Sequence, residues 1–189
     1  MARSVAFLRA INVGGRVVTM ERLRRTFEQL GLVNVETFIA SGNVLFESRR
    51  ARLRLEAEIS SALQKELGFE VAAFVRNEPE LRIIAAHQPF PTFDVAAGHT
   101  LFVAFVASQP SAEARDLLLH CGSLTDEFHF DGEQLYWLCR TRASDSTFSG
   151  PRLEKTLRLR VTVRNVNTIR RLVGKMDDAR ERKVVSPTS

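Results

Sequence analysis

Val75-Arg76-Asn77 returns 88 positions later as Val163-Arg164-Asn165. The similarity continues into the segments that follow, where an apolar-Arg-x-apolar pattern recurs at the same spacing: Leu81, Arg82 and Ile84, then Ile169, Arg170 and Leu172. A strand-like apolar run enters each copy, and an amphipathic helix pattern follows it. An internal repeat of this kind predicts two similar units in place of one irregular domain.

Each half of the sequence predicts the order strand, helix, strand, strand, helix, strand, with one added helix. In the first half we expect strands at 4–10, 35–39, 44–46 and 69–75, and helices over 20–30, 55–67 and from Pro79 onward. In the second half we expect strands at 101–107, on both sides of Asp131-Gly132 and at 161–163. Helices are expected over 110–119, from Pro151 onward, and over the segment that contains Ile169 and Leu172. Asp-Gly between two alternating runs favours a β-hairpin. Gly132 follows Gly42 by 90 positions, which supports a duplication.

This order is that of the ferredoxin-like split β-α-β motif. We therefore predict an α+β fold, a tandem duplication of two ferredoxin-like βαββαβ units with antiparallel sheets, each followed by an extra helix. The expected boundaries are 1–87 for the first unit, 88–99 for a linker rich in Pro and Gly, 100–180 for the second unit and 181–189 for a frayed tail.

The same topology predicts which turns are neighbours. The exit of the first strand and the turn of the first hairpin should lie at one end of the sheet. Gly14-Gly15 and Ser41-Gly42-Asn43 would then be close together, with Arg9 and Asn12 beside them. The Val-Arg-Asn segments should close the fourth strands at the opposite end.

Composition places the chain among ordinary globular proteins, with 44% hydrophobic and 26% charged residues. The apolar run at the N-terminus stops at Arg9, which is typical of a first strand and not of a signal peptide. No apolar stretch reaches the roughly 18 residues of a membrane span, so the cytosol is the expected location. We expect Cys121 and Cys139 to be unpaired. No two histidines stand at a metal-ligand spacing, so no metal is expected. Neither Gly-x-x-x-x-Gly-Lys-Ser/Thr nor Gly-x-Gly-x-x-Gly is present, and no other cofactor is expected.

Two blocks of residues resemble a known family. The first is Phe7–Gly15 followed by Met20, the second is Phe38–Val44, and the likeness continues through Leu135-Tyr136 to Thr168. Together they resemble the domain-of-unknown-function family numbered 1697, which implies a two-part α+β protein and no reaction. Many members have a Gly-x-Gly-Arg-Ser-Lys-like loop after the Tyr136 strand, whereas this chain has Arg142–Gly150, with Phe148 and no lysine.

The polar, glycine-containing turns of the first unit are the best candidate for a binding site. Glycine lets backbone N–H groups approach a ligand, a helix N-terminus favours an anion, and arginine binds phosphate or carboxylate. We therefore predict a small anionic ligand bound by seven residues: Arg9, Asn12, Gly14, Gly15, Ser41, Gly42 and Asn43. The competing interpretation is that the glycines only permit the turns while the asparagines satisfy loop backbone.

Two other functions stay open at this point. Net charge is +5, and the segment from Gly150 is rich in Lys and Arg, which favours an anionic partner such as nucleic acid. RNA stacking would require exposed aromatic residues on the sheet, with Phe7 and Phe46 as candidates; of the neighbours Tyr136 and Trp137, at most one should face the core. The third function is a protein-interaction module without a small-molecule site. No catalytic residue, reaction or oligomeric state can be read from the sequence.

Overall fold

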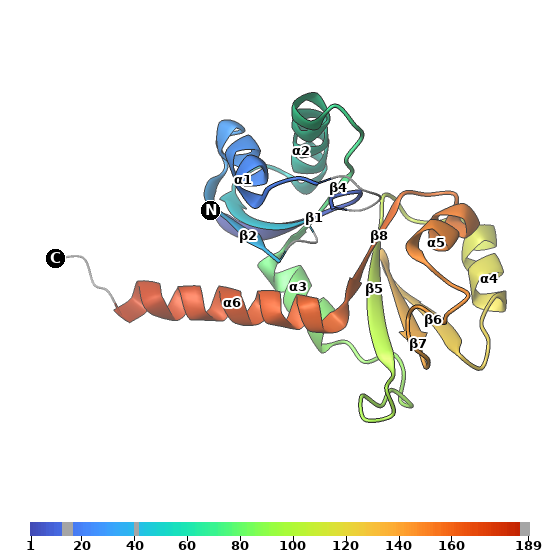
Figure 1. Ribbon diagram of the computed structural model, residues 1–189. Coiled ribbons are helices and arrows are strands. Elements are labelled where there is room, and N and C mark those ends of the chain that lie inside the picture. The colour runs from blue at the N-terminus through green and yellow to red at the C-terminus, as the bar shows by residue number, and fades with distance from the viewer. Residues whose placement is uncertain (13–16, 40–41, 186–189) are drawn as a thin grey trace. The chain divides into compact units, whose positions relative to one another are not determined.

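The computed structural model describes residues 1–12, 17–39 and 42–185 of the chain. It divides into two compact units (Figure 1). Unit 1 comprises Met1–Ile84 together with the chain from Leu172 onward, and unit 2 comprises Ala85–Arg171.

Unit 1 contains a four-stranded antiparallel sheet. Its elements follow one another as β1 (Ala2–Leu8), α1 (Met20–Gln29), β2 (Val33–Phe38), β3 (Asn43–Ser48), α2 (Arg52–Leu67), β4 (Ala73–Asn77) and α3 (Glu78–Ala86). The strands lie in the order β2-β3-β1-β4. Since β1 and β3 are central and β4 pairs with β1, this is the predicted ferredoxin-like arrangement.

Unit 2 repeats the arrangement with a sheet in the order β6-β7-β5-β8. Its elements are β5 (Thr100–Val106), α4 (Ala112–His120), β6 (Asp126–Asp131), β7 (Gln134–Cys139), α5 (Gly150–Leu157), β8 (Val161–Asn165) and α6 (Val166–Val185). The predicted fold class, two duplicated ferredoxin-like units each followed by a helix, is confirmed.

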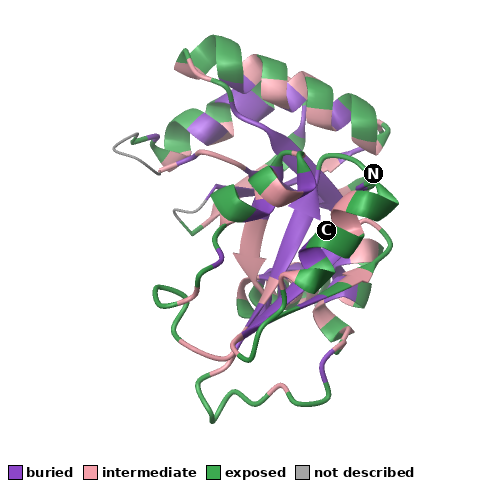
Figure 2. Ribbon diagram, turned by 90° about the vertical axis from the view of Figure 1, so that its right-hand side faces the viewer, coloured by how far each residue is buried: buried purple, intermediate pink, exposed green. Residues whose placement is uncertain are grey.

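One face of each sheet is covered by two helices, α1 and α2 in unit 1 and α4 and α5 in unit 2. Alternation along the strands directs every second side chain into these layers. In unit 1, Ala6, Leu8 and Phe46 pack against Phe27 and Ile59 of the helices. In unit 2 the corresponding core contains Trp137, Phe128 and Leu153. The strands are largely buried while the helices have exposed outer faces (Figure 2).

The other face of the unit 1 sheet lies against the far part of α6. The Arg3 guanidinium donates to the carbonyl of Met176 at 3.3 Å, and Lys175 pairs with Glu36 of β2 at 2.8 Å. Arg82 of α3 hydrogen-bonds to Asp177 and lowers the pKa of that carboxyl. From the sequence we expect residues up to 180 in the second unit and 181–189 in a tail. In the structure, Leu172 and the residues after it group with unit 1, and α6 continues to Val185.

The repeated Val-Arg-Asn segments have the same structural role in both units. The buried Arg76 and the half-buried Arg164 each donate through Nη1 to the carbonyl of the preceding valine, at 2.7 and 2.8 Å. Asn77 Oδ1 accepts from the N–H of Glu80, and Asn165 Oδ1 accepts from the N–H of Asn167. Both asparagines thus hold the turn from a strand into a helix, as the sequence suggested.

Several details differ from the expectation. The first and fourth strands are Ala2–Leu8 and Ala73–Asn77, because pairing with neighbouring strands and not local β-propensity sets their limits. Phe7 and Phe46 are fully buried, so neither presents a ring for base stacking. Tyr136 and Trp137 do face opposite sides of β7, yet both are buried, since unit 2 also covers the second face of this strand.

Among the described residues, the helices include none of the length and apolar character required to cross a membrane.

Candidate functional site

Three segments meet at the end of the unit 1 sheet where β1 leaves it. Phe7 pairs with Asn43, and the N–H of Leu8 donates to the carbonyl of Gly42 at 2.7 Å. The N–H of Arg9 donates to the carbonyl of Ala72, ahead of β4, at 2.8 Å. The fold therefore brings the described residues of the predicted site to one end of the sheet. These residues are Arg9, Asn12, Gly42 and Asn43.

Left-handed backbone conformations gather at this end. Ala10, Asn12 and Ile39 have φ of 67°, 54° and 50°, and Gly42 has φ of 73°. Outside glycine this conformation is unfavourable, and such residues cluster where a loop shape serves a function. A Cβ on Gly42 would lie 3.0 Å from the Ile11 Cβ, so glycine here also permits the close approach of the two turns.

The two asparagines have local backbone partners. Asn12 Oδ1 accepts from the N–H of Val18 at 2.7 Å. Asn43 is fully buried, and its Nδ2 donates to the carbonyl of Phe38 at 3.1 Å. Both bonds correspond to the structural interpretation raised from the sequence, so the asparagines shape the turns. Arg9 is half-buried, while Gly14, Gly15 and Ser41 lie outside the described residues.

The loop that departs from the family pattern is held to unit 2 by its own side chains. Ser146 donates to Asp126 at 2.7 Å, and Ser149 caps α5 by accepting from the N–H of Arg152. Phe148 is buried in the core, at 4.7 Å between ring centroids from Phe128. These contacts anchor the loop. Its sequence from Arg142 to Gly150 contains no lysine that could bind an anion.

Asp126 is a buried carboxylate that sequence reasoning missed. Its Oδ1 accepts from Trp137 Nε1 at 2.8 Å as well as from Ser146, and its Oδ2 accepts from Thr125. Since these partners come from a strand and two loops, only the folded chain brings them together. The network satisfies a buried acid through neutral donors, which is a structural role.

Some basic residues of the last third have contacts within the protein. The Arg152 guanidinium lies 4.2 Å from the centre of the Phe148 ring, and Arg170 donates to the carbonyl of Ala85. Burial lowers the pKa of Arg164 to about 10. Lys175 pairs with Glu36, so four basic residues of this segment have a partner in the protein.

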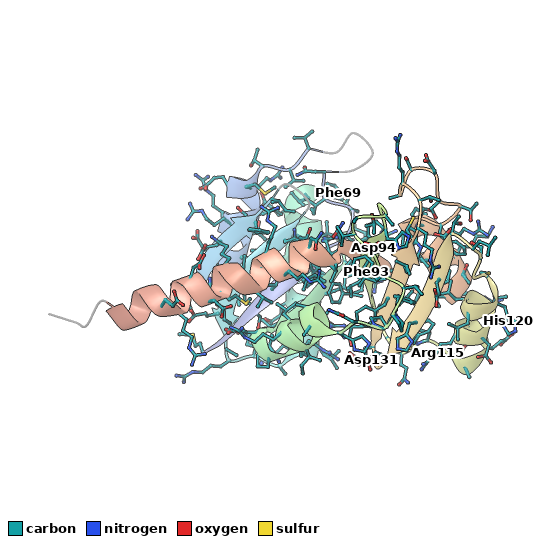
Figure 3. The ribbon with its side chains drawn as sticks, turned by 90° about the horizontal axis from the view of Figure 1, so that it is seen from below. Phe69, Phe93, Asp94, Arg115, His120 and Asp131 are labelled. Atoms are coloured by element: carbon teal, nitrogen blue, oxygen red, sulfur yellow. The ribbon has the colours of Figure 1, made fainter. Side chains whose placement is uncertain are left out.

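A second polar cluster in unit 2 involves the chain's single tyrosine. The Tyr136 ring lies 4.8 Å from the ring of His87, and Asp131 Oδ2 lies 3.9 Å from His87 Nε2 (Asp131 is labelled in Figure 3). Burial, followed by the charge of Asp131, raises the pKa of Tyr136 well above its usual value. Within residues 1–12, 17–39 and 42–185, no three His, Cys, Asp or Glu side chains are grouped as a metal site would need, and both cysteines are free.

Comparison with known proteins addresses family and fold. A family model described as a protein of unknown function (DUF1697) matches residues 1–136, which include every predicted site residue. The chain belongs to this family. Among solved structures, the chain is similar to the conserved bacterial protein SP0830 from Streptococcus pneumoniae, with 22% sequence identity and a TM-score of 0.69. The match covers 93% of this chain and 98% of that one. This similarity shows that the DUF1697 protein and SP0830 share a fold. No curated protein matches the chain.

Proposed function

We propose that this DUF1697 protein binds a small anionic ligand at the end of the unit 1 sheet where β1 leaves it. The observation that carries the proposal is the convergence of the Leu8–Asn12 and Gly42–Asn43 turns, in which Ala10 and Asn12 have the left-handed conformation. Backbone in such conformations can turn N–H groups toward one point, which suits an anion. Arg9 adds a guanidinium at the same end of the sheet.

A titration with inorganic phosphate, followed by amide chemical shifts of the 15N-labelled chain, tests the proposal. The amides of Leu8 to Asn12 and of Gly42 and Asn43 should shift in a saturable manner. Arg9→Ala should weaken binding by at least about tenfold, since a charge-assisted hydrogen bond contributes roughly 1.5–3 kcal/mol.

Arg49→Ala is the matched control, because Arg49 is exposed and follows β3 at the opposite end of the sheet. It should leave the phosphate affinity unchanged. The proposal fails if phosphate moves none of these amides, or if Arg9→Ala and Arg49→Ala bind phosphate equally well.

Nucleic-acid binding through the basic last third remains a separate hypothesis, and the internal contacts of Arg152, Arg164 and Arg170 weigh against it. It predicts an affinity for RNA or DNA that falls steeply with salt. A protein-interaction module would instead show no small-molecule binding in a broad ligand screen.

A further inference from the structure

The two units differ in the groove between their two outer helices. Equivalent positions are identified by the helix caps. Thr19 and Ser111 accept from the N–H three residues later, at the start of α1 and α4 respectively. Gly68 and Arg158 end α2 and α5, both in the left-handed conformation, with φ of 77° and 54°. Counting from these caps, Arg22 corresponds to Ala114, and Glu66 corresponds to Thr156.

In unit 1 an ion pair spans the groove. Arg22 Nε lies 2.8 Å from Glu66 Oε1, and the same guanidinium donates to the Glu66 carbonyl. Both residues line the hollow between α1 and α2, together with Thr19 and Arg25. Unit 1 thus uses its own side chains to connect the two helices.

In unit 2 no ion pair crosses the corresponding groove among the residues that the structure describes. Ala114 and Thr156 are too short to form such a bridge, and a hollow of about 200 Å³ lies between α4 and the end of α5. Its lining includes the polar residues Glu113, Thr156 and Arg158. It also includes the apolar residues Leu117, Leu157 and Leu159. Leu117 is 54% exposed, which leaves apolar surface for a ligand to cover.

The two charged residues of this groove have no protein partner. Among the residues that the structure describes, neither Glu113 nor Arg158 forms an ion pair or a side-chain hydrogen bond. Arg158 also stands where unit 1 has glycine, although the left-handed conformation is unfavourable for a non-glycine residue. An arginine therefore occupies a position that favours glycine.

We propose that the α4–α5 groove binds a small aliphatic amino acid. The ligand's carboxylate would pair with Arg158, its ammonium group with Glu113, and its side chain would cover Leu117 and Leu159. A zwitterion matches a lining with one cation and one anion, and the apolar residues favour an aliphatic chain. The volume is below the roughly 300–1,000 Å³ of drug-sized sites, which restricts the ligand to a small molecule.

The ligand class is tested by amide chemical shifts of the 15N-labelled full chain with three probes. L-leucine carries both charged groups, 4-methylpentanoate lacks the ammonium group, and 3-methylbutylamine lacks the carboxylate. L-leucine should shift the amides of Ala114, Leu117 and Leu159. Each analogue should bind at least about tenfold more weakly, because it leaves one charged residue of the groove unpaired. If 4-methylpentanoate binds as tightly as L-leucine, or if L-leucine moves none of these amides, the proposal is overturned.

Two variants take their residues from unit 1. Arg158→Gly installs the unit 1 residue at a glycine-compatible position, so the fold should be kept while L-leucine binding falls by at least about tenfold. The double variant Ala114→Arg/Thr156→Glu installs the unit 1 ion pair in the groove and should abolish binding. Arg142→Ala removes an exposed arginine from another loop and should leave binding unchanged. Unaltered L-leucine affinity in Arg158→Gly would contradict the assignment.

Discussion

Asn77 and Glu80 cap each other at the start of α3. The Asn77 N–H donates to Glu80 Oε2 at 2.7 Å, and the Glu80 N–H donates to Asn77 Oδ1 at 2.9 Å. This reciprocal capping box supplies partners to two N–H groups that would otherwise have none. The second copy keeps the asparagine but has Thr168 at the position of Glu80, so Asn165 caps α6 without a reciprocal partner.

Asn77→Ala should lower the free energy of unfolding by about 1 kcal/mol, the usual effect of losing an N-cap. Asn165→Ala should have a smaller effect, because it removes one bond and not a reciprocal pair. Urea unfolding of both variants measures the difference. Gln64→Ala, on an exposed site of α2, serves as the control and should change little. A larger loss for Asn165→Ala would show that the capping box is not the stronger cap.

Gly42→Ala should destabilise the chain more than Gly98→Ala. Both glycines have positive φ, which costs alanine roughly 1–2 kcal/mol. Only at Gly42 would the added Cβ also crowd the side chains of Ile11 and Leu8, at 3.0 and 3.2 Å. Thermal unfolding of the two variants separates the conformational penalty from the steric one. Equal losses would mean that the two turns can separate without cost.

Asp126→Ala should destabilise unit 2 by about 1–3 kcal/mol, since it leaves buried donors without an acceptor. Asp126→Asn should be milder, because its amide oxygen can still accept from Trp137 Nε1 and Ser146. Trp137 is the chain's single tryptophan, so its fluorescence reports on the loss of this bond directly. Unchanged emission in Asp126→Ala would contradict the network.

Tyr136 should ionise only well above the usual tyrosine pKa of about 10. Burial, and then the charge of Asp131, raises the folded-state pKa of Tyr136. The neutral phenol therefore contributes its full stability at pH values below the unfolded-state pKa of about 10. This contribution is lost as the pH rises through the folded-state pKa. An ultraviolet titration follows this single tyrosine without interference from others. Asp131→Asn should lower the pKa in part, and Asp116→Asn, on an exposed site of α4, should not change it.

Local signals in the sequence predicted most elements of the fold. The Asp131-Gly132 turn and the helices predicted over 20–30 and 55–67 are each determined by neighbouring residues, and all three are present. The order of the elements then determined the topology, including the approach of Leu8 to Gly42.

Contacts between distant residues were not predictable in the same way. The pattern of Ile169, Leu172 and Met176 indicates that α6 has a buried face, but periodicity does not say which sheet it covers. Likewise, Trp137 and Ser146 are 11 and 20 residues from Asp126, and no spacing rule connects them. At the candidate site, topology placed the turns together, whereas the left-handed backbone of Ala10 and Ile39 has no signal in residue type.

The position of α6 has a consequence for how the chain folds as it is made. The residues that pair with Arg3, Glu36 and Arg82 come from the second copy of the repeat. On the ribosome, the first β-sheet therefore emerges long before the helix that covers its second face. The apolar side chains on that face stay partly exposed until the second repeat has been translated. A nascent chain of the first repeat alone should accordingly depend on chaperones, although its sequence contains a complete ferredoxin-like set of strands.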